Sequence, residues 1–294
     1  MLGGAFADVL ACHQPGLRLH ALGREQLDVT DTAAVARAAA LAPDVIIHCA
    51  ALVDMDRCER EGDLCRRNIV EGTSHVASLA IRTGAQLVYP QSVFIFGESP
   101  EAPLTEGAQP VPRSAYGRAK LEAEQLILAH CPRALVVRMG GFFGGEERDK
   151  NFVGTFSRGV ASQVAAGVNR IEVGDRVWQP SFTGDLATNT LLLVARERSG
   201  VYHMAAHGEA TFAEVAVQIL EGLGLAARMR LITRPAAQFA ARESALRPLR
   251  SAVDNARLRA EGLDRQRPWR ETLMEYLARP YFQGLVRAAA VGER

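Results

Sequence analysis

The sequence predicts an α/β fold: a doubly wound parallel sheet, followed by a smaller mixed α/β lobe. Short apolar runs such as residues 44–51 alternate with helical stretches through the first half of the chain, which is typical of parallel strands buried on both faces. Repeated alternation of this kind implies right-handed crossovers. Beyond Gly145 the elements become shorter, and 294 residues suffice for one large unit with an appended lobe.

The elements of the first half follow in a regular order. Residues 1–11 have the pattern of an amphipathic helix with no strand ahead of it. The apolar stretch 17–22 is expected as a strand that ends at Gly23, and a helix over 32–41 begins at its N-cap, Asp31. The buried strand 44–51 leads to helical patterns over 59–82, with Gly84 as the C-cap.

The later elements divide the chain into two parts. The first part is completed by four elements: a strand that begins at 86–89, a Pro-rich loop over 100–112, a helix over 114–130 and a strand over 134–138. The second part is expected to hold strands near 171–173, 201–204 and 228–232 and helices near 185–195, 212–223 and 269–278. The predicted division is a domain over 1–145, to which 180–204 returns, and a lobe over 146–294.

The composition narrows the class of partner. The 34 basic and 33 acidic residues give a net charge of +1, which removes the electrostatic argument for nucleic acid or a membrane surface and favours a small molecule. Five cysteines without metal-ligand spacing, and no leader pattern, predict a cytoplasmic protein with no metal site. No apolar run approaches the ~20 residues that span a bilayer.

The strongest motif is Tyr116 with Lys120, four residues apart on the predicted helix 114–130. Positions four apart share a helix face, so the phenol and the ammonium can reach one cleft. A neighbouring ammonium favours the phenolate, and we therefore expect it to lower the pKa of Tyr116 from ~10. Lys120 is one of only two lysines among the 34 basic residues, which favours a role that needs a compact ammonium.

Ser92 is the third candidate catalytic residue. It follows the buried strand 86–89, and this places its hydroxyl at the carboxyl edge of the sheet, where α/β proteins bind their ligands. Together with Tyr116 and Lys120, Ser92 is predicted to orient a substrate carbonyl oxygen. The three side chains provide a hydrogen-bond donor, a proton donor and a cation.

With these residues the chain resembles the extended short-chain dehydrogenase/reductase superfamily, whose triad is Ser/Thr, Tyr and Lys. The resemblance runs from Gly3 onward, and in the second half it is most similar to the dTDP-4-dehydrorhamnose reductase family. Matching segments are residues 27–31, 48–51, 68–73, 92–97, 116–120, 175–187, 200–203, 247–248 and 269–273. The segment 90–96 keeps the family's hydroxyl but lacks its usual Asp and Tyr.

The resemblance implies a Rossmann-like sheet and NADPH-dependent reduction of a nucleotide-linked 4-keto-6-deoxysugar. Arg24 stands where an acidic residue would select NAD and suits a 2′-phosphate, which favours NADPH over NADH. The implied cofactor residues are Gly3, Arg24, Asp28, Val29, Ala50, Ala51, Leu52, Asn68, Tyr116 and Lys120. The implied substrate residues are Arg138, Arg176 and Trp178. The resemblance also implies a homodimer.

The beginning of the chain departs from this pattern. In dinucleotide-binding folds a strand runs into a glycine-rich turn, and the next helix N-terminus meets the pyrophosphate. Gly3 or Gly4 matches only the last glycine of that turn, and the first strand is missing from the 294 residues. Two explanations stay open: a shortened chain or a start codon placed too late, and a true loss of the phosphate loop, which would weaken cofactor binding.

Three other activities compete with reduction. A 4,6-dehydratase would follow the hydroxyl residue with an Asp-Glu pair, whereas Val93 and Phe94 follow Ser92, so dehydration is disfavoured. A sugar-nucleotide epimerase would use the same triad with a retained NAD. A non-catalytic binding protein is the remaining alternative, because relatives of this reductase family serve as regulatory subunits of methionine adenosyltransferase.

Overall fold

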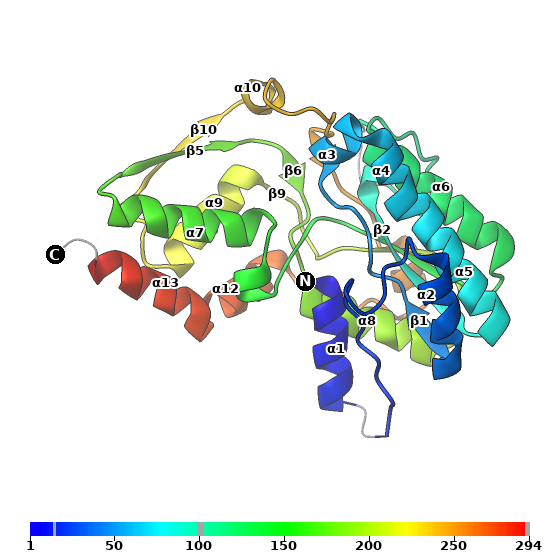
Figure 1. Cartoon of the computed structure of the whole chain (residues 1–294). Coiled ribbons are helices and arrows are strands. Elements are labelled where there is room, and N and C mark those ends of the chain that lie inside the picture. Colours follow the sequence, from blue (N-terminus) through cyan, green and yellow to red (C-terminus); the bar gives the residue numbers. More distant parts are fainter. Residues whose placement is uncertain (14–15, 99–102, 292–294) are drawn as a thin grey trace.

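The structure is a computed structural model that describes residues 1–13, 16–98 and 103–291. Part of the predicted loop 100–112, at residues 100–102, and the last three residues of the predicted second lobe lie outside the described residues. Two lobes are visible: a larger one around a central sheet, at the right of Figure 1, and a smaller one at its left.

The larger lobe is built on a four-stranded parallel sheet, as predicted. Its order is β1 (Val45–Ile47), β2 (Gln86–Ser92), β3 (Leu135–Met139) and β8 (Gly200–Met204), and every neighbouring pair is parallel. In the register of β2 and β3, Gln91 lies opposite Arg138 and Ser92 opposite Met139. β8 comes from far along the chain and closes the sheet beside β3.

Helices cover both faces of this sheet, because successive strand residues point to opposite sides. Leu87 and Tyr89 pack with one layer of helices and Val88 with the other. The first layer consists of α2 (Thr32–Arg37), α3 (Met55–Arg60), α4 (Gly62–Arg66), α5 (Gly72–Thr83) and α6 (Ala115–His130). The second consists of α1 (Leu2–His13) and α8 (Thr183–Ala195). The doubly wound α/β class is confirmed (Figure 1).

Local signals set several helix ends. The Asp31 side chain accepts hydrogen bonds from the backbone of residues 33 and 34 and caps α2, which continues as a 3-10 turn, η1 (Ala38–Leu41). Gly84 ends α5 in the left-handed conformation, at a φ of 71°. Ser114 caps α6 through the backbone N–H of Gly117, 3.1 Å away. These caps match the predicted boundaries.

The helical region predicted over 59–82 is present, but it begins earlier and is interrupted. Helix formation begins earlier, because Asp54 caps α3, and it stops at Glu61, whose φ and ψ of −122° and 63° are not helical. A π-helical turn, η2 (Arg67–Glu71), then joins α4 to α5. Hydrophobic periodicity reports which positions are buried but does not report a change of helix axis, so the break was not predicted.

The strand predicted over 17–22 is also not formed. These residues have no strand assignment, and Leu17, Leu19 and Leu22 expose 55%, 44% and 43% of their surfaces. A strand exists only where a neighbour supplies hydrogen-bond partners, and no described strand pairs with this stretch. β1 is an edge strand for the same reason, and Val45 is 37% exposed.

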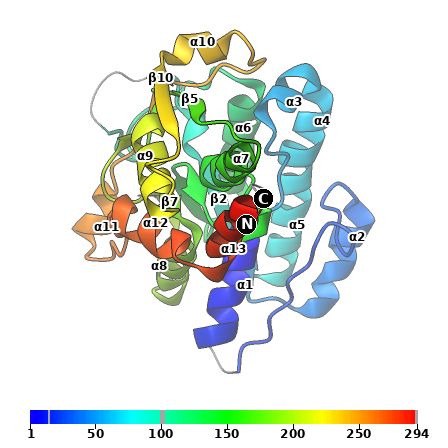
Figure 2. The same ribbon diagram turned by 90° about the vertical axis from the view of Figure 1, so that its left-hand side faces the viewer.

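The smaller lobe combines short strand pairs with helices that share a core of their own (Figure 2). Its sheets pair β5 (Arg170–Gly174) with β10 (Arg230–Arg234), β6 (Val177–Trp178) with β9 (Ala210–Thr211) and β11 (Arg250–Ser251), and β4 (Phe142–Phe143) with β7 (Ser181–Phe182). Its helices are α7 (Phe152–Ala165), α9 (Phe212–Gly222), α10 (Ala236–Ala240), α12 (Trp269–Leu277) and α13 (Pro280–Val291). Single 3-10 turns are η3 (Val93–Ile95) and η4 (Glu146–Arg148).

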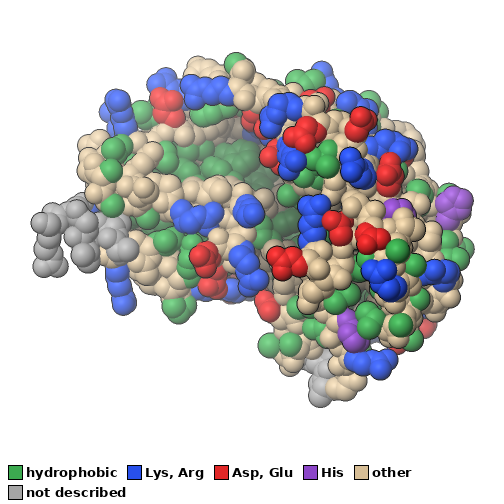
Figure 3. Space-filling model, viewed as in Figure 1, with side chains coloured by type: hydrophobic (Ala, Val, Ile, Leu, Met, Phe, Trp, Pro, Cys, Tyr) green, Lys and Arg blue, Asp and Glu red, His purple; other side chains and the backbone are tan. Residues whose placement is uncertain are grey.

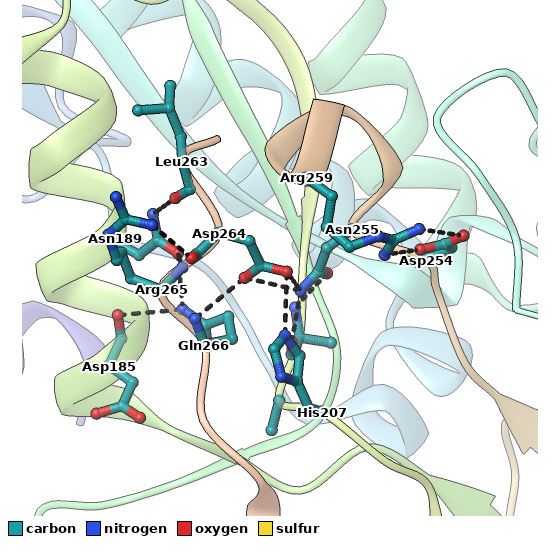
Figure 4. Close-up of polar contacts among 12 residues, drawn as sticks. Asp185, Asn189, His207, Asp254, Asn255, Arg259, Leu263, Asp264, Arg265 and Gln266 are labelled. Carbon is teal, nitrogen blue, oxygen red and sulfur yellow. Dashed lines mark hydrogen bonds and ion pairs between the residues drawn. The ribbon is translucent and has the colours of Figure 1, made fainter. Parts of the chain in front are cut away.

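A polar cluster fastens the segment around α11 (Ala256–Ala260) to the sheet (Figure 4). The Asn255 amide exchanges two hydrogen bonds with the backbone of Ala205, just after β8. Asp264 contacts the ring of His207 at 3.0 Å, and the Asn189 amide of α8 donates to Leu263 O at 2.8 Å. Because these groups bind one another and the backbone, the cluster is structural.

Two further features concern the described residues as a set. None of their helices has both the length and the apolar character required to cross a membrane. Across the ranges 1–13, 16–98 and 103–291, no three His, Cys, Asp or Glu residues form a group suited to a metal ion.

Candidate active site

Ser92 and Tyr116 meet where β2 ends and α6 begins. Ser92 is the last residue of β2, and Tyr116 lies in the first turn of α6. A Cβ on Gly117 would lie only 2.3 Å from the carbonyl oxygen of Phe94, so a glycine is required for the helix to approach the strand end this closely. The Ser92 side chain lies close enough to the Tyr116 hydroxyl to lower the pKa of the phenol.

Lys120 lies one helical turn beyond Tyr116 and is buried, with 3% of its surface exposed. Its Nζ donates to the carbonyl oxygen of Pro90 at 2.9 Å and lies 3.8 Å from the centre of the Tyr89 ring. The cation is therefore directed at β2, the strand that carries Ser92. The structure thus brings the three predicted catalytic residues to one end of β2.

The electrostatics differ from the sequence expectation. Burial raises the pKa of Tyr116 to about 12, although the neighbouring Ser92 side chain opposes this shift. Burial also lowers the pKa of Lys120 to about 7, and the carboxylate of Glu124 opposes that shift. The expected lowering of the Tyr116 pKa by Lys120 is wrong, because desolvation of the buried phenol is the largest effect on its pKa and only the Ser92 side chain opposes it. At neutral pH Tyr116 carries its proton.

The N-terminal turn of α1 lies beside the end of β1. A Cβ on Gly3 would be 3.5 Å from Cβ of Cys49, and one on Gly4 would meet no atom within 4 Å. The loop that follows Cys49 contains Ala50, Ala51 and Leu52, of which the last two are partly buried. Free N–H groups, a positive dipole end and no acidic residue in the first turn fit the phosphates of a dinucleotide.

Two further predicted cofactor residues form a turn. Asp28 Oδ1 accepts from the backbone N–H and the hydroxyl of Thr30 at 2.9 and 2.8 Å, and these bonds, foremost the backbone one, lower the pKa of Asp28. The Arg24 guanidinium, three-quarters exposed, lies 3.1 Å from the other oxygen. The Asp28 carboxylate is therefore engaged in holding the turn and Arg24.

The side chains of Val29 and Asn68 are each engaged in a contact with a helix. A Cβ on Gly72 would be 2.8 Å from Cγ2 of Val29, so Val29 packs closely on the start of α5. The Asn68 amide donates to Leu64 O at 2.9 Å from within the π-helical turn η2. Such turns occur frequently at functional sites.

Arg138 does not present its charge to a ligand. Its guanidinium donates to both oxygens of the Glu124 carboxylate, at 2.5 and 3.2 Å, and the two side chains are 7% and 2% exposed. A further nitrogen lies 3.5 Å from the Glu106 carbonyl and from the His203 ring. The expectation that Arg138 contacts the substrate is therefore corrected, because its positive charge is already neutralised by Glu124 inside the protein.

Arg176 and Trp178 each retain a buried N–H that finds no partner within residues 1–13, 16–98 and 103–291. Arg176 uses its two terminal nitrogens for Glu243, at 2.8 and 2.6 Å, and its Nε has no partner. Trp178 stacks on Phe212 with a ring separation of 5.1 Å, and its Nε1 has no partner. Figure 3 shows a hollow with a hydrophobic floor on the face where β5, β6 and α7 meet the larger lobe.

The structure adds residues that the sequence interpretation missed. Gln91 and Glu124 are buried beside the three candidate catalytic residues. Glu124 lies four residues after Lys120, and this helical spacing is a signal that could have found it. Gln91 directly precedes Ser92, but its neighbours come from a distant helix, and no local pattern marks it.

Comparison with known proteins identifies the family to which the chain belongs. The family model described as RmlD substrate binding domain matches residues 2–282. The dTDP-4-dehydrorhamnose reductase of Streptomyces griseus is 32% identical over 283 residues, 94% of this chain and 89% of that protein. That of Mycobacterium tuberculosis is 32% identical over 271 residues, which cover 90% of this chain and 86% of that protein.

Solved structures agree with this result. A dTDP-4-dehydrorhamnose reductase from Clostridium acetobutylicum superposes with a TM-score of 0.85 at 28% identity and covers 94% of each chain. The UDP-glucose 4-epimerase of Thermus thermophilus reaches a TM-score of 0.78 at 18% identity, covering 97% of this chain and 96% of its own, and shows the fold alone. The family model spans nearly the whole chain, and the chain therefore belongs to the RmlD substrate binding domain family, as its resemblance to the dTDP-4-dehydrorhamnose reductases predicted.

Proposed function

We propose that the protein reduces the 4-keto group of a nucleotide-linked 6-deoxysugar, with NADPH as reductant. The relatives named dTDP-4-dehydrorhamnose reductase, at 32% identity over most of the chain, support this reaction. The observation that carries the proposal is the cluster at the end of β2, where Ser92 ends the strand, Tyr116 lies in the first turn of α6 and Lys120, one turn later, binds the Pro90 carbonyl of the same strand.

Tyr116 acts as the proton donor. A pKa of about 12 keeps its hydroxyl protonated at neutral pH, and this is the form required to protonate a carbonyl oxygen as it gains negative charge. Ser92 donates a hydrogen bond to the same oxygen and orients the carbonyl group between the two hydroxyls. When bound, NADPH supplies the hydride that adds to the carbonyl carbon.

Lys120 lies on the side of the site where the cofactor is proposed to bind. Its position is set by the Pro90 carbonyl and the Tyr89 ring, and it is predicted to bind a ribose hydroxyl. With a pKa of about 7, the side chain can both accept and give a proton near neutral pH. Lys120 is therefore suited to replace the proton that Tyr116 loses.

In this proposal one lobe binds the dinucleotide and the other binds the nucleotide sugar. Residues 1–145, with 180–204, bind the dinucleotide through the first turn of α1, the turn at Asp28, the loop 50–52 and Asn68. Arg24 is exposed and able to meet a 2′-phosphate, which favours NADPH over NADH. Residues 146–294 hold the nucleotide sugar, and the unpartnered N–H groups of Arg176 and Trp178 are offered to it.

The proposal also covers the cellular compartment of the protein and its oligomeric state. All five cysteines are free, which agrees with a reducing compartment, and we place the protein in the cytoplasm. We also propose a homodimer, to be tested by light scattering coupled to size-exclusion chromatography. Neither proposal involves nucleic acid or a membrane.

The test is NADPH oxidation in the presence of dTDP-4-keto-6-deoxysugars, with Tyr116→Phe as the variant. Loss of the proton donor is expected to reduce kcat by about 100-fold or more. Tyr281→Phe serves as the control, because Tyr281 lies in α13 outside the proposed site.

Three outcomes oppose the proposal. Activity that survives Tyr116→Phe refutes the mechanism. Turnover of a nucleotide sugar without consumption of added NADPH favours the epimerase. Binding of NADPH or nucleotide sugar without turnover favours a non-catalytic protein.

A further inference from the structure

We propose that Gln91 is a positioning residue for this site, which holds Ser92 at a fixed distance from Tyr116 and Lys120 on α6. The inference rests on the proposed function and adds a residue to it. Ser92 and Tyr116 come from a strand and a helix that are 23 residues apart in the sequence and joined by a long loop, so some contact must set their relative position.

The Gln91 side chain makes three hydrogen bonds, one within β2 and two to α6. Its Oε1 accepts from the backbone N–H of Ser92 at 2.8 Å. Its Nε2 donates to the backbone carbonyl of Lys120 and to Oε2 of Glu124, both at 2.8 Å. Only 3% of the Gln91 surface is exposed, so water does not replace these bonds. One amide thus connects the catalytic serine to the turn of α6 that carries the lysine.

The partner of this amide is itself held in place. Glu124 receives the Arg138 guanidinium on both carboxylate oxygens, and Arg138 lies opposite Gln91 in the register of β2 and β3. Side chains from the neighbouring strands β2 and β3 therefore bind the same carboxylate of α6. An ion pair that is also hydrogen-bonded to a neutral amide has little freedom to shift, because each displaced bond would leave a buried polar group unpaired.

A catalytic arrangement of hydroxyls is sensitive to small displacements. A shift of about 1 Å in a reacting group can reduce the rate by about 100-fold. Removal of the Gln91 amide frees Ser92 and the first two turns of α6 to move relative to each other. The expected effect falls on kcat, because ligand contacts made by other parts of the protein are unchanged.

The test compares Gln91→Met with Gln86→Met. Both glutamines lie in β2 and are buried, and Gln86 donates to two backbone carbonyls, of Arg133 and Arg198, at the opposite end of the strand. Both variants are expected to lose thermal stability. Gln91→Met is expected to reduce kcat between about 10- and 100-fold, with the KM values for NADPH and sugar within about threefold of wild type. Gln86→Met keeps the wild-type kcat.

A second readout isolates the chemical step. The primary isotope effect on kcat, measured with NADPH deuterated at the transferred position, is expected to rise in Gln91→Met and to stay at the wild-type value in Gln86→Met. A residue that only stabilises the fold would not change this ratio.

Exchange of the two side chains provides a rescue. Gln91→Glu alone puts two carboxylates in contact, and Glu124→Gln alone removes the buried partner of Arg138. The double variant removes the contact between two carboxylates and again leaves one carboxylate for Arg138, although the new side chain at position 91 cannot donate to the Lys120 carbonyl. It is therefore expected to recover part of the kcat lost in Gln91→Glu. If Gln91→Met does not fold, the comparison of this double variant with Gln91→Glu tests the role of Gln91 instead.

Four results overturn the proposal or its basis. Equal losses of kcat in Gln91→Met and Gln86→Met, a wild-type kcat in Gln91→Met, or a double variant no better than Gln91→Glu each reject the role of Gln91 while the wild type remains active. A wild type that does not oxidise NADPH with any of these sugars rejects the proposed function, and the present inference with it.

Discussion

The Asp56 carboxylate and the Arg247 guanidinium form a two-point ion pair, with Oδ2–Nη2 and Oδ1–Nη1 distances of 2.7 and 3.2 Å. Asp56 lies in α3 of the larger lobe, and Arg247 lies in the segment that follows α10. The same carboxylate accepts from the backbone of Ser244 and Ala245 at 2.8 and 2.9 Å. One side chain thus fastens the segment 243–247 to the larger lobe (Figure 1).

Asp56→Asn is expected to destabilise the protein in a pH-dependent way. Hydrogen bonding to Arg247, foremost, lowers the pKa of Asp56 from 3.8 to about 2. A carboxylate with a lowered native pKa contributes stability that is complete above the unfolded value of 3.8 and disappears as the pH falls toward 2. The difference in urea midpoint between wild type and variant should therefore be constant above about pH 4 and vanish near about pH 2.

Glu172→Gln is the control for this prediction. Its pair with Arg234 is about half exposed, and such pairs contribute little. A pH-independent difference between wild type and Asp56→Asn, or equal effects of both substitutions, would contradict the assignment. Hydrogen exchange at residues 243–247 should be faster in Asp56→Asn alone.

Arg138→Met separates a structural from a ligand-binding role. The substitution leaves the Glu124 carboxylate buried without its partner, and we expect a loss of about 3 to 5 kcal/mol in the free energy of unfolding. Arg138→Met combined with Glu124→Gln should recover part of that loss, because no charge is then buried alone. A variant of unchanged stability with a raised KM for the sugar would restore the substrate role.

Trp178→Phe is expected to weaken sugar binding and also to lose some stability, because the smaller ring leaves space in the core. Nε1 has no partner among the described residues, so its removal costs no hydrogen bond there, and a phenyl ring can still stack on Phe212. The KM for the nucleotide sugar should rise about threefold to tenfold, as expected for one hydrogen bond, while kcat is unchanged. Loss of thermal stability with an unchanged KM would show that Trp178 only fills the core.

Gly4→Asp tests the first turn of α1 as a phosphate site. A carboxylate near a helix N-terminus stabilises the helix but repels a bound phosphate. The KM for NADPH should rise about tenfold or more at low salt, while the melting temperature is unchanged or higher. Gly4→Ala is the matched control, because a Cβ there meets no atom within 4 Å. Equal KM values for the Asp and Ala variants would exclude phosphate from this turn.

Much of the fold was predictable because its signals are local. The apolar runs that form β2 and β3, the caps Asp31 and Ser114, and the four-residue spacing of Tyr116 and Lys120 all depend on residues adjacent in the chain or one turn apart. The division into residues 1–145 and 146–294 and the ligand roles of individual residues stay predictions.

The sequence by itself determined the α/β class, the helix caps and the residue types of the catalytic cluster, since periodicity and capping act over a few residues. Only the tertiary structure decided that residues 17–22 form no strand, that Arg138 is engaged by Glu124, and that Gln91 connects Ser92 to α6. These outcomes depend on partners from distant parts of the chain or on a neighbouring strand. No local pattern specifies which distant group will supply a hydrogen bond or a counter-charge.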